Sequence, residues 1–265
     1  MLPGAFPPCW HSCEVDAVKE ILTQGLASMG LTPPPDGVEK LCRYGELLLE
    51  QNQVMNLTAI TEPPQVARLH FLDSAAILAW GSRFAGAADS GGKSWLAGKT
   101  LVDVGTGAGF PGVVLKILEP ALSLTLVDSL GKRVAWLEKV CEALSLDGVR
   151  CLHARAEELA LEPGFRDGFD VATSRAVAAF PALCELCLPY VKPGGVFLAM
   201  KSLGSGGEVE EGQNAVNRLG GKAFGIWDYP IPGTDASHRI VGVEKVSPTP
   251  KGLPRSWGKI KKAPL

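Results

Sequence analysis

Long apolar runs are missing from this chain of 265 residues. No uninterrupted apolar stretch approaches the roughly 20 residues that a membrane span needs, and the first ten residues lack the basic region and apolar segment of a secretory signal. An excess of charge is missing too, because 26 basic residues face 28 acidic ones. We therefore expect a cytoplasmic protein without a membrane span. A globally basic nucleic-acid binder is excluded, but a local basic patch is not.

A disulfide or zinc framework is also missing. The seven cysteines are an odd number at irregular spacing, which argues against a disulfide scaffold in a chain of this length. Cys184 and Cys187 have metal or redox spacing, but they lie in an apolar helical pattern without a second pair or a nearby His. We expect buried packing thiols and no metal site.

What is present is a glycine-rich turn after a short apolar run. Residues 101–104 are typical of a buried parallel strand. Gly105, Gly107 and Gly109 allow a tight turn and a close approach of the backbone to a ligand, because they have no Cβ. Pro111 then suits the start of a helix. Such a turn points amide N–H groups at one spot above the strand end, so we predict a nucleotide-like cofactor there.

Two acidic residues bear on the identity of that cofactor. The glycines of residues 107–112 also satisfy the dinucleotide-binding pattern, which is weak alone. Asp103 precedes the turn, where a carboxylate can hold a cationic amino group directly or through water. S-adenosylmethionine carries such a group and NAD does not. Asp128 ends the next strand and is placed to accept hydrogen bonds from both ribose hydroxyls, which suits either cofactor. A glycine turn without a ligand is the simpler alternative.

Beyond the turn, strands alternate with helices, which indicates a parallel sheet wrapped by helices. We predict an α/β fold of the Rossmann-like class I S-adenosylmethionine-dependent methyltransferase type, with a mostly parallel seven-stranded sheet and an N-terminal helical extension. The segment after Lys201 is glycine-rich and is expected to form a flexible loop over the site. The expected strands are residues 101–104, 122–127, 149–153, 169–174, 196–201, 222–231 and 238–246.

Three helical patterns precede this domain, at residues 15–29, 36–49 and 61–80. Asp36 and Glu39 form a capping-box signature for the second helix. Residues 85–98 are rich in Gly, Ala and Ser and indicate a linker. We therefore expect three parts: an N-terminal helical extension with its linker (1–98), a cofactor-binding methyltransferase domain (99–248) and a basic C-terminal tail (249–265).

Two segments are candidates for contact with RNA. Asn52 and Asn56 lie between the second and third helices, where asparagine is usually a cap or turn residue; amide recognition of a base edge is the alternative. Residues 251–265 contain five basic residues and no acid. Most basic tails are merely solvated, but Trp257 offers a ring for base stacking and the prolines stiffen the segment. This combination suits a folded RNA contact.

Asp103, Asp128, Glu157 and Arg175 fall at or just after expected strand ends, the edge where open α/β sheets bind ligands. For Arg175 the simplest role is an ion pair with Asp170 or Glu157. A guanidinium near the cofactor's carboxylate is the functional alternative and the one we favour.

Several motifs occur together from about Asn52 to the end of the chain. They are Asn52 with Asn56–Thr58, His70–Ser74, Asp103–Gly112, Asp128–Arg133, Arg155–Glu158, Ser174–Ala176, Lys192–Gly195 and a tail with Pro254–Arg255, lysines and Pro264–Leu265. In this combination the chain resembles the bacterial 16S rRNA guanine-N7 methyltransferases of the RsmG or GidB family. The resemblance implies S-adenosylmethionine contacts at Gly105, Phe110, Ala156, Glu157 and Arg175, and a 16S rRNA substrate in the small ribosomal subunit. With that substrate, a position near guanine O6 is a second functional alternative for Arg175.

The implied reaction is in-line transfer of the sulfonium methyl to guanine N7. N7 has an exposed lone pair and no proton, so no general base is needed and no catalytic residue is assigned. Alignment of donor and acceptor can supply on the order of 7–11 kcal/mol. The expected cofactor-binding residues are Asp103, Gly105, Thr106, Gly107, Gly109, Phe110, Asp128, Ser129, Ala156, Glu157 and Arg175. The expected substrate-binding residues are Asn52, Asn56, His70, Arg133, Lys201 and Arg255.

The alternatives are a methyltransferase of another RNA, a small molecule or a protein, and a non-catalytic ribosome-binding module that keeps the cofactor fold. The basic tail and the asparagine segment count against a small-molecule or protein substrate. The sequence does not determine the oligomeric state, and a monomer is favoured.

Overall fold

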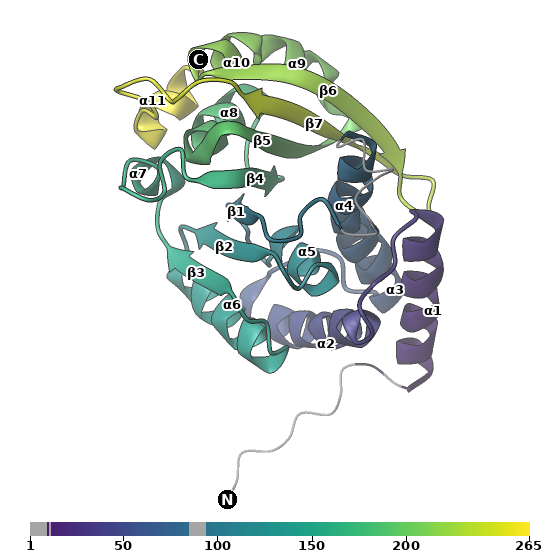
Figure 1. Cartoon of the computed structure of the whole chain (residues 1–265). Coiled ribbons are helices and arrows are strands. Elements are labelled where there is room, and N and C mark those ends of the chain that lie inside the picture. Colours follow the sequence, from purple (N-terminus) through teal and green to yellow (C-terminus); the bar gives the residue numbers. More distant parts are fainter. Residues whose placement is uncertain (1–9, 11, 85–93) are drawn as a thin grey trace, which may run out of the picture.

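The computed structural model describes residue 10, residues 12–84 and residues 94–265. A seven-stranded sheet with the order β3-β2-β1-β4-β5-β7-β6 forms its centre, with helices on both faces (Figure 1). Strands β1 to β5 pair in parallel, and β7 runs antiparallel to both β5 and β6. This architecture confirms the predicted fold class. The strands are β1 (Thr100–Val104), β2 (Ser123–Asp128), β3 (Val149–His153), β4 (Phe169–Arg175), β5 (Val191–Ser202), β6 (Gly221–Pro230) and β7 (Ser237–Lys245).

The middle of the sheet is apolar because helices cover it on both faces. The last four residues of β1 are buried, and so are the last five of β2. Strands β2 and β4 flank β1, so the carboxyl ends of these three parallel strands meet at one edge. The chain reverses its winding direction between β1 and β4, and ligands of open α/β sheets bind at such a switch point.

Helices α5 (Gly112–Leu118) and α6 (Gly131–Ala143) follow β1 and β2, while α7 (Ala156–Leu159) and α8 (Phe180–Cys187) follow β3 and β4. A 3-10 turn, η3 (Leu188–Tyr190), joins α8 to β5. The prediction of a flexible loop after Lys201 was wrong. The segment forms a 3-10 turn, η4 (Leu203–Ser205), and helix α9 (Gly206–Glu211), which α10 (Gln213–Arg218) follows. Glu208 fixes α9 because its carboxylate accepts a hydrogen bond from Phe180 N and pairs with Lys201 at 2.6 Å.

The three N-terminal helical patterns are present. They form α1 (Ser12–Ser28), α2 (Gly37–Met55) and a continuous segment of α3 (Pro63–Val66), the π-helix η1 (Ala67–Leu72) and α4 (Asp73–Phe84). The expected capping box was wrong, because Asp36 makes no side-chain cap bond and instead pairs with Lys40 at 2.8 Å. Most of the expected linker, residues 85–93, lies outside the described residues.

Two hydrophobic clusters stabilise the sheet. The first joins the N-terminal helices to the sheet, so residues as distant as Leu22 and Ile240 share one core. The second contains Cys184 and Cys187, which are both fully buried, as expected of packing thiols. None of the helices in the described ranges combines the length and the apolar character that a bilayer crossing requires.

The C-terminal tail belongs to the second cluster through Leu253, Ile260 and Leu265. It ends in a short helix, α11 (Trp257–Lys262), which packs near α8 (Figure 1). The guanidinium of Arg166 donates hydrogen bonds to the carbonyls of Thr249, Pro250 and Leu253. The tail is therefore a fixed part of the fold.

Candidate functional site

The turn between β1 and α5 requires glycine for two reasons. Gly105, Gly107 and Gly109 have positive φ angles of 69°, 60° and 98°, which L side chains rarely adopt. A Cβ at Gly105 would lie 2.6 Å from a methyl of Val177, and one at Gly109 would lie 2.5 Å from the hydroxyl of Tyr44. The backbone thus passes too close to its neighbours for any side chain at these two positions.

Asp103 lies beneath this turn and is fully buried. Its Oδ2 accepts hydrogen bonds from Thr106 Oγ1 at 2.8 Å and from the backbone N of Gly112 at 2.9 Å. Its Oδ1 has no hydrogen-bond partner among the residues that the structure describes. Burial raises the pKa of Asp103 to about 6, since water no longer stabilises the charged form. Asp103 therefore holds the turn together and keeps one buried oxygen unpaired.

A cavity of about 220 Å³ lies over the ends of β1, β2 and β3. Asp128 lines it, and its carboxylate accepts hydrogen bonds from the backbone N of Gly107 and of Leu130, both at 2.9 Å. Five residues expected to bind the cofactor meet here: Gly105, Asp128, Ser129, Ala156 and Glu157. The lining also includes Val104, Val127, Ala154, Arg155, Val177, Leu186 and Trp257, which were not expected at a cofactor site.

A second cavity, of about 410 Å³, lies at the ends of β4 and β5. Its volume falls within the range of about 300–1,000 Å³ that is usual for small-molecule sites. It brings together three of the predicted site residues, namely His70, Arg175 and Lys201. The rest of its lining is Leu69, Asp73, Ala176, Met200, Ser202 and His238.

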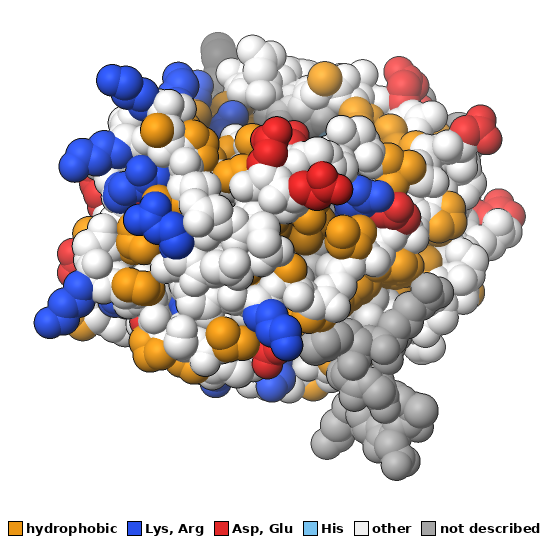
Figure 2. All heavy atoms as spheres, turned by 90° about the horizontal axis from the view of Figure 1, so that it is seen from above, with side chains coloured by type: hydrophobic (Ala, Val, Ile, Leu, Met, Phe, Trp, Pro, Cys, Tyr) orange, Lys and Arg blue, Asp and Glu red, His pale blue; other side chains and the backbone are white. Residues whose placement is uncertain are grey.

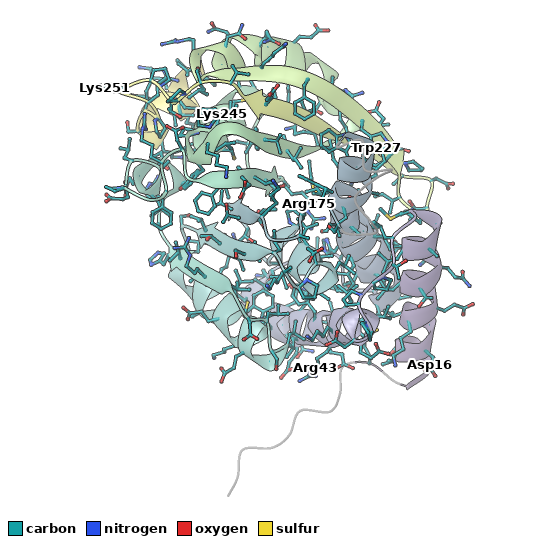
Figure 3. The ribbon with its side chains drawn as sticks, in the orientation of Figure 1. Asp16, Arg43, Arg175, Trp227, Lys245 and Lys251 are labelled. Carbon is teal, nitrogen blue, oxygen red and sulfur yellow. The ribbon has the colours of Figure 1, made fainter. Side chains whose placement is uncertain are left out.

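Arg175 lines this second cavity, not the first. Figure 3 places it in the middle of the molecule, between the end of β4 and helix α4. Its Nη1 lies 2.7 Å from Asp73 Oδ2, and its Nη2 contacts His70 Nδ1 at 3.2 Å. Neither simple partner expected from the sequence is bound, because Asp170 pairs with Lys192 and Glu157 pairs with Arg155.

Asp73 is the centre of a buried polar network. Its carboxylate accepts hydrogen bonds from Arg175, from the Tyr229 hydroxyl at 2.8 Å and from His238 Nδ1 at 2.8 Å. Burial alone would raise the pKa of Asp73, but the hydrogen bonds from His238 and Tyr229 and the charge of Arg175 lower it overall. The hydrogen bond to Asp73 in turn raises the pKa of His238. The network therefore favours an ionised Asp73 beside a protonated His238.

The pKa of His70 is shifted in the opposite direction to that of His238. Burial, and then the charge of Arg175, lower its pKa to about 3, so its ring is neutral. Its Nδ1 accepts from Arg175, which leaves Nε2 to donate to Thr58 Oγ1 at 2.8 Å. The ring stacks on Phe110 with centroids 4.5 Å apart, and the guanidinium of Arg175 lies 4.9 Å from the centre of the same ring. Phe110 thus connects the glycine turn to the second cavity and does not line the first.

The last residue of β4 and the two residues that follow it separate the two cavities. Arg175 and Ala176 line the second, and Val177 lines the first. Ala176 has a φ of 56°, a left-handed conformation that is uncommon for a residue with a Cβ. Strained backbone of this kind is frequent at functional sites. A ligand in one cavity and a ligand in the other would meet across this short segment.

Several predicted residues line neither cavity: the fully buried Asp103, Thr106, Gly107 and Gly109 of the strand end and turn, and Phe110. The amide of Asn52 makes three hydrogen bonds to the backbone of Leu57 and Thr58, as expected of a turn residue. Asn56 caps α2 in a left-handed conformation.

Two predicted arginines are held by acidic residues. Arg133 lies 3.6 Å from Asp128 at the first cavity. Arg255, expected to contact RNA, binds the fully buried carboxylate of Glu185 through Nε and Nη2 at 2.8 and 2.7 Å. His238 and the position of Trp257 at the first cavity were not predicted from the sequence. An Asp73 within an apolar helix was the available signal for the network, because a buried acid requires partners.

The strand order, the glycine turn and the acidic residue that ends β2 define the class I S-adenosylmethionine-dependent methyltransferase fold. A solved structure of similar fold, that of a mutant of MtNAS, superposes with a TM-score of 0.50 at 15% identity and covers 88% of this chain and 87% of that one. At that identity the similarity bears on the fold alone.

The family described as rRNA small subunit methyltransferase G matches residues 37–226. A relative of that name from Lachnoclostridium phytofermentans is 43% identical over 244 residues, 91% of this chain and 95% of the relative. Another, from Clostridium perfringens, is 41% identical over 246 residues, 93% of this chain and 98% of the relative. The chain belongs to the rRNA small subunit methyltransferase G family, which confirms the resemblance seen in its motifs.

Proposed function

We propose that this protein transfers the methyl group of S-adenosylmethionine to N7 of a guanine in 16S rRNA of the small ribosomal subunit. The observation that carries the proposal is the pair of cavities on either side of residues 175–177. One cavity has the features of a nucleoside site and the other has room for an acceptor base. The family name supplies the rRNA substrate.

The residues that line the first cavity suit the cofactor. Asp128 ends β2 and faces the cavity, where its carboxylate can accept hydrogen bonds from ribose hydroxyls. Val177, Leu186 and Trp257 provide apolar surface for a purine ring. Beneath the turn, the unpaired Oδ1 of Asp103 lacks the partner that an ammonium group would provide, directly or through water. A nicotinamide dinucleotide has no such cationic amino group.

When bound, S-adenosylmethionine supplies a sulfonium methyl: the N7–C bond forms as the C–S bond breaks, the electron pair leaves with sulfur, and the positive charge passes to the purine. The protein's own residues have no proton to move in this step, because N7 carries none. Their task is to bind and align. Ala176 and Val177 hold the boundary between the cavities, and the Arg175–Asp73 pair fixes the end of β4. Alignment of this kind can supply on the order of 7–11 kcal/mol of barrier lowering.

Recognition of RNA requires a positively charged surface. The net charge of the chain is −2, so that surface has to be a local patch. Lys259, Lys261 and Lys262 are exposed on α11. Figure 2 shows Lys and Arg side chains gathered at the left, the side on which α11 lies in Figure 1. This local patch is suited to phosphate contacts.

The test is methyl transfer from radiolabelled S-adenosylmethionine to three acceptors: small-subunit particles and naked 16S rRNA, both from cells that lack this protein, and a protein mixture without RNA. We expect label in the RNA of at least one of the first two acceptors and none in protein. Label in protein alone would refute the proposal. Calorimetry that gives heat with NAD but none with S-adenosylmethionine would refute the cofactor assignment.

A further inference from the structure

His238, on β7, lines the second cavity and has one ring nitrogen without a hydrogen-bond partner among the described residues. Its Nδ1 donates to Asp73, so the ring is fixed, and Nε2 makes no hydrogen bond to another described residue. The side chain is 34% exposed, whereas that of Asp73 is 1% exposed. The other two cations of the cavity are already engaged: Arg175 with Asp73 and His70, and Lys201 with Glu208. His238 is therefore the charged group best placed to meet a ligand.

The cavity suits a ligand edge that only accepts hydrogen bonds. Arg175, Lys201 and His238 line it, and Asp73, the one acidic side chain among the described residues of the lining, is fully used by three donors. Among the bases, guanine alone presents two acceptors, O6 and N7, on its major-groove edge, whereas adenine and cytosine present an amino group there. N7 has to stay free to receive the methyl group. O6 is then the atom left for the protein to recognise.

We propose that the second cavity binds the target guanine and that His238 Nε2 donates a hydrogen bond to its O6. This assignment rests on the proposed function and adds the residue that selects the base. Asp73 and Tyr229 are positioning residues, because the Asp73 carboxylate accepts from His238 Nδ1 and the Tyr229 hydroxyl donates to that same carboxylate. The raised pKa of His238 supports the assignment, since Nε2 carries a proton only in the imidazolium when Nδ1 already donates to Asp73.

The contact has a definite kinetic signature. As the methyl group bonds to N7, positive charge develops on the ring and O6 becomes a weaker acceptor. The hydrogen bond is therefore at least as strong in the bound substrate as in the transition state, and interactions of that kind lower KM without raising kcat. Loss of the donor should raise KM for RNA and leave kcat nearly unchanged.

Two substitutions separate recognition of the base from support of the fold. In His238→Asn the amide can replace Nδ1 toward Asp73 but leaves no donor at the position of Nε2. In His238→Gln the longer side chain brings an N–H to the position of Nε2 at the expense of the Asp73 contact. A role in base recognition predicts that Gln performs better than Asn, and a purely structural role predicts the reverse.

Asp228→Asn provides a matched control, since Asp228 pairs with Arg239 on the same two strands. The next pair of opposed residues on these strands is Tyr229 and His238. Successive side chains of a strand point to opposite faces of the sheet, so Asp228 and Arg239 point away from the face that carries His238. Asp228 is 49% exposed and lines neither cavity. We expect its kcat and its KM to match those of the unmodified protein.

The experiment measures kcat and KM for small-subunit RNA, together with the Kd for S-adenosylmethionine, for all four proteins. We expect His238→Asn to raise KM about tenfold, within the range of about 5- to 150-fold typical of one base contact. Its kcat should change less than about twofold and the cofactor Kd should be unchanged. His238→Gln should have a lower KM than His238→Asn. An unchanged KM for His238→Asn, or a higher KM for Gln than for Asn, overturns the inference.

The salt dependence of KM distinguishes a base contact from a phosphate contact. Removal of one phosphate contact to single-stranded RNA flattens the logarithmic salt slope by about 0.7. We expect the slope of His238→Asn to match that of the unmodified protein, and a flattening of that size would assign His238 to a phosphate instead. If the unmodified protein transfers no methyl to RNA, the proposed function itself fails, and that result needs no variant.

Discussion

The guanidinium of Arg175 lies 2.7 Å from the carboxylate of Asp73, although 102 residues separate them along the chain. Their side chains are 16% and 1% exposed. This ion pair joins the N-terminal helices to the strand end that separates the two cavities. It therefore stabilises the fold and also positions the site.

Removal of Arg175 should destabilise the protein strongly. Arg175→Ala leaves a buried carboxylate with one donor fewer, and breaking a buried ion pair costs about 3–5 kcal/mol of unfolding free energy. Arg175→Lys keeps the charge and should lose less. Urea denaturation measures both. Lys19→Ala is the control, because Lys19 and Glu39 form an exposed pair worth less than about 1 kcal/mol. An Arg175→Ala loss as small as the control's would contradict the role given to the pair.

Asp103→Asn should be more stable than the unmodified protein, and the difference should grow as the pH rises. Its pKa of about 6 in the folded protein exceeds the ordinary value of 3.8, so the folded state binds this proton more tightly than the unfolded state. Stability is therefore lost as the pH rises from about 4 through 6. Asp103→Asn removes the buried charge and should be more stable than the unmodified protein at pH 8, by up to about 3 kcal/mol.

Near pH 4 the two proteins should differ little, and their unfolding free energies at the two pH values provide the comparison. The same variant should bind S-adenosylmethionine more weakly, because the amide provides no charge for an ammonium group. A stability difference independent of pH would show that Asp103 titrates normally.

The tail should support both the fold and the first cavity. Arg255→Ala leaves the buried Glu185 carboxylate without its guanidinium partner, at a cost of about 3–5 kcal/mol. Trp257 should then leave the cavity lining, so affinity for S-adenosylmethionine should fall as well. Thermal melting and calorimetry measure the two effects. Lys262→Ala, on the exposed face of α11, should change neither, and equal behaviour of the two variants would refute the anchoring role of Arg255.

The exposed lysines of α11 should contribute to RNA binding and not to binding of S-adenosylmethionine. Replacement of Lys259, Lys261 and Lys262 by Ala should weaken RNA binding at low salt and flatten its salt dependence, by about 0.7 in logarithmic slope for each phosphate that is no longer bound. Affinity for S-adenosylmethionine should stay constant, because these side chains line neither cavity. RNA binding at several salt concentrations is the measurement. An unchanged slope would place the RNA elsewhere on the surface.

Local features of the site were predictable from the sequence and distant pairings were not. The glycine turn and Asp128 follow from spacing within one strand–turn–helix unit, which fixes the backbone over a few residues. The contacts of His238 with Asp73 and of Arg255 with Glu185 span 165 and 70 residues, and no local pattern encodes them. Arg175 was placed at the correct strand end, but its partner lies on a helix that spacing along the sheet does not locate.

The packing of the C-terminal tail was likewise not predictable from local sequence. Its basic composition indicated contact with solvent or RNA, yet Leu253, Ile260 and Leu265 pack into the second core cluster. Apolar residues among lysines were the available signal for docking. Only the tertiary fold identifies the buried Glu185 that holds Arg255.

Methylation of guanine N7 is tested most directly by identifying the methylated nucleoside itself. Small-subunit RNA from cells lacking the protein is incubated with the protein and S-adenosylmethionine bearing a trideuterated methyl group, and its nucleosides are separated by mass spectrometry. We expect 7-methylguanosine that carries the deuterium label. Label in a methylated adenosine or cytidine, or in no nucleoside while the cofactor is bound, would contradict it.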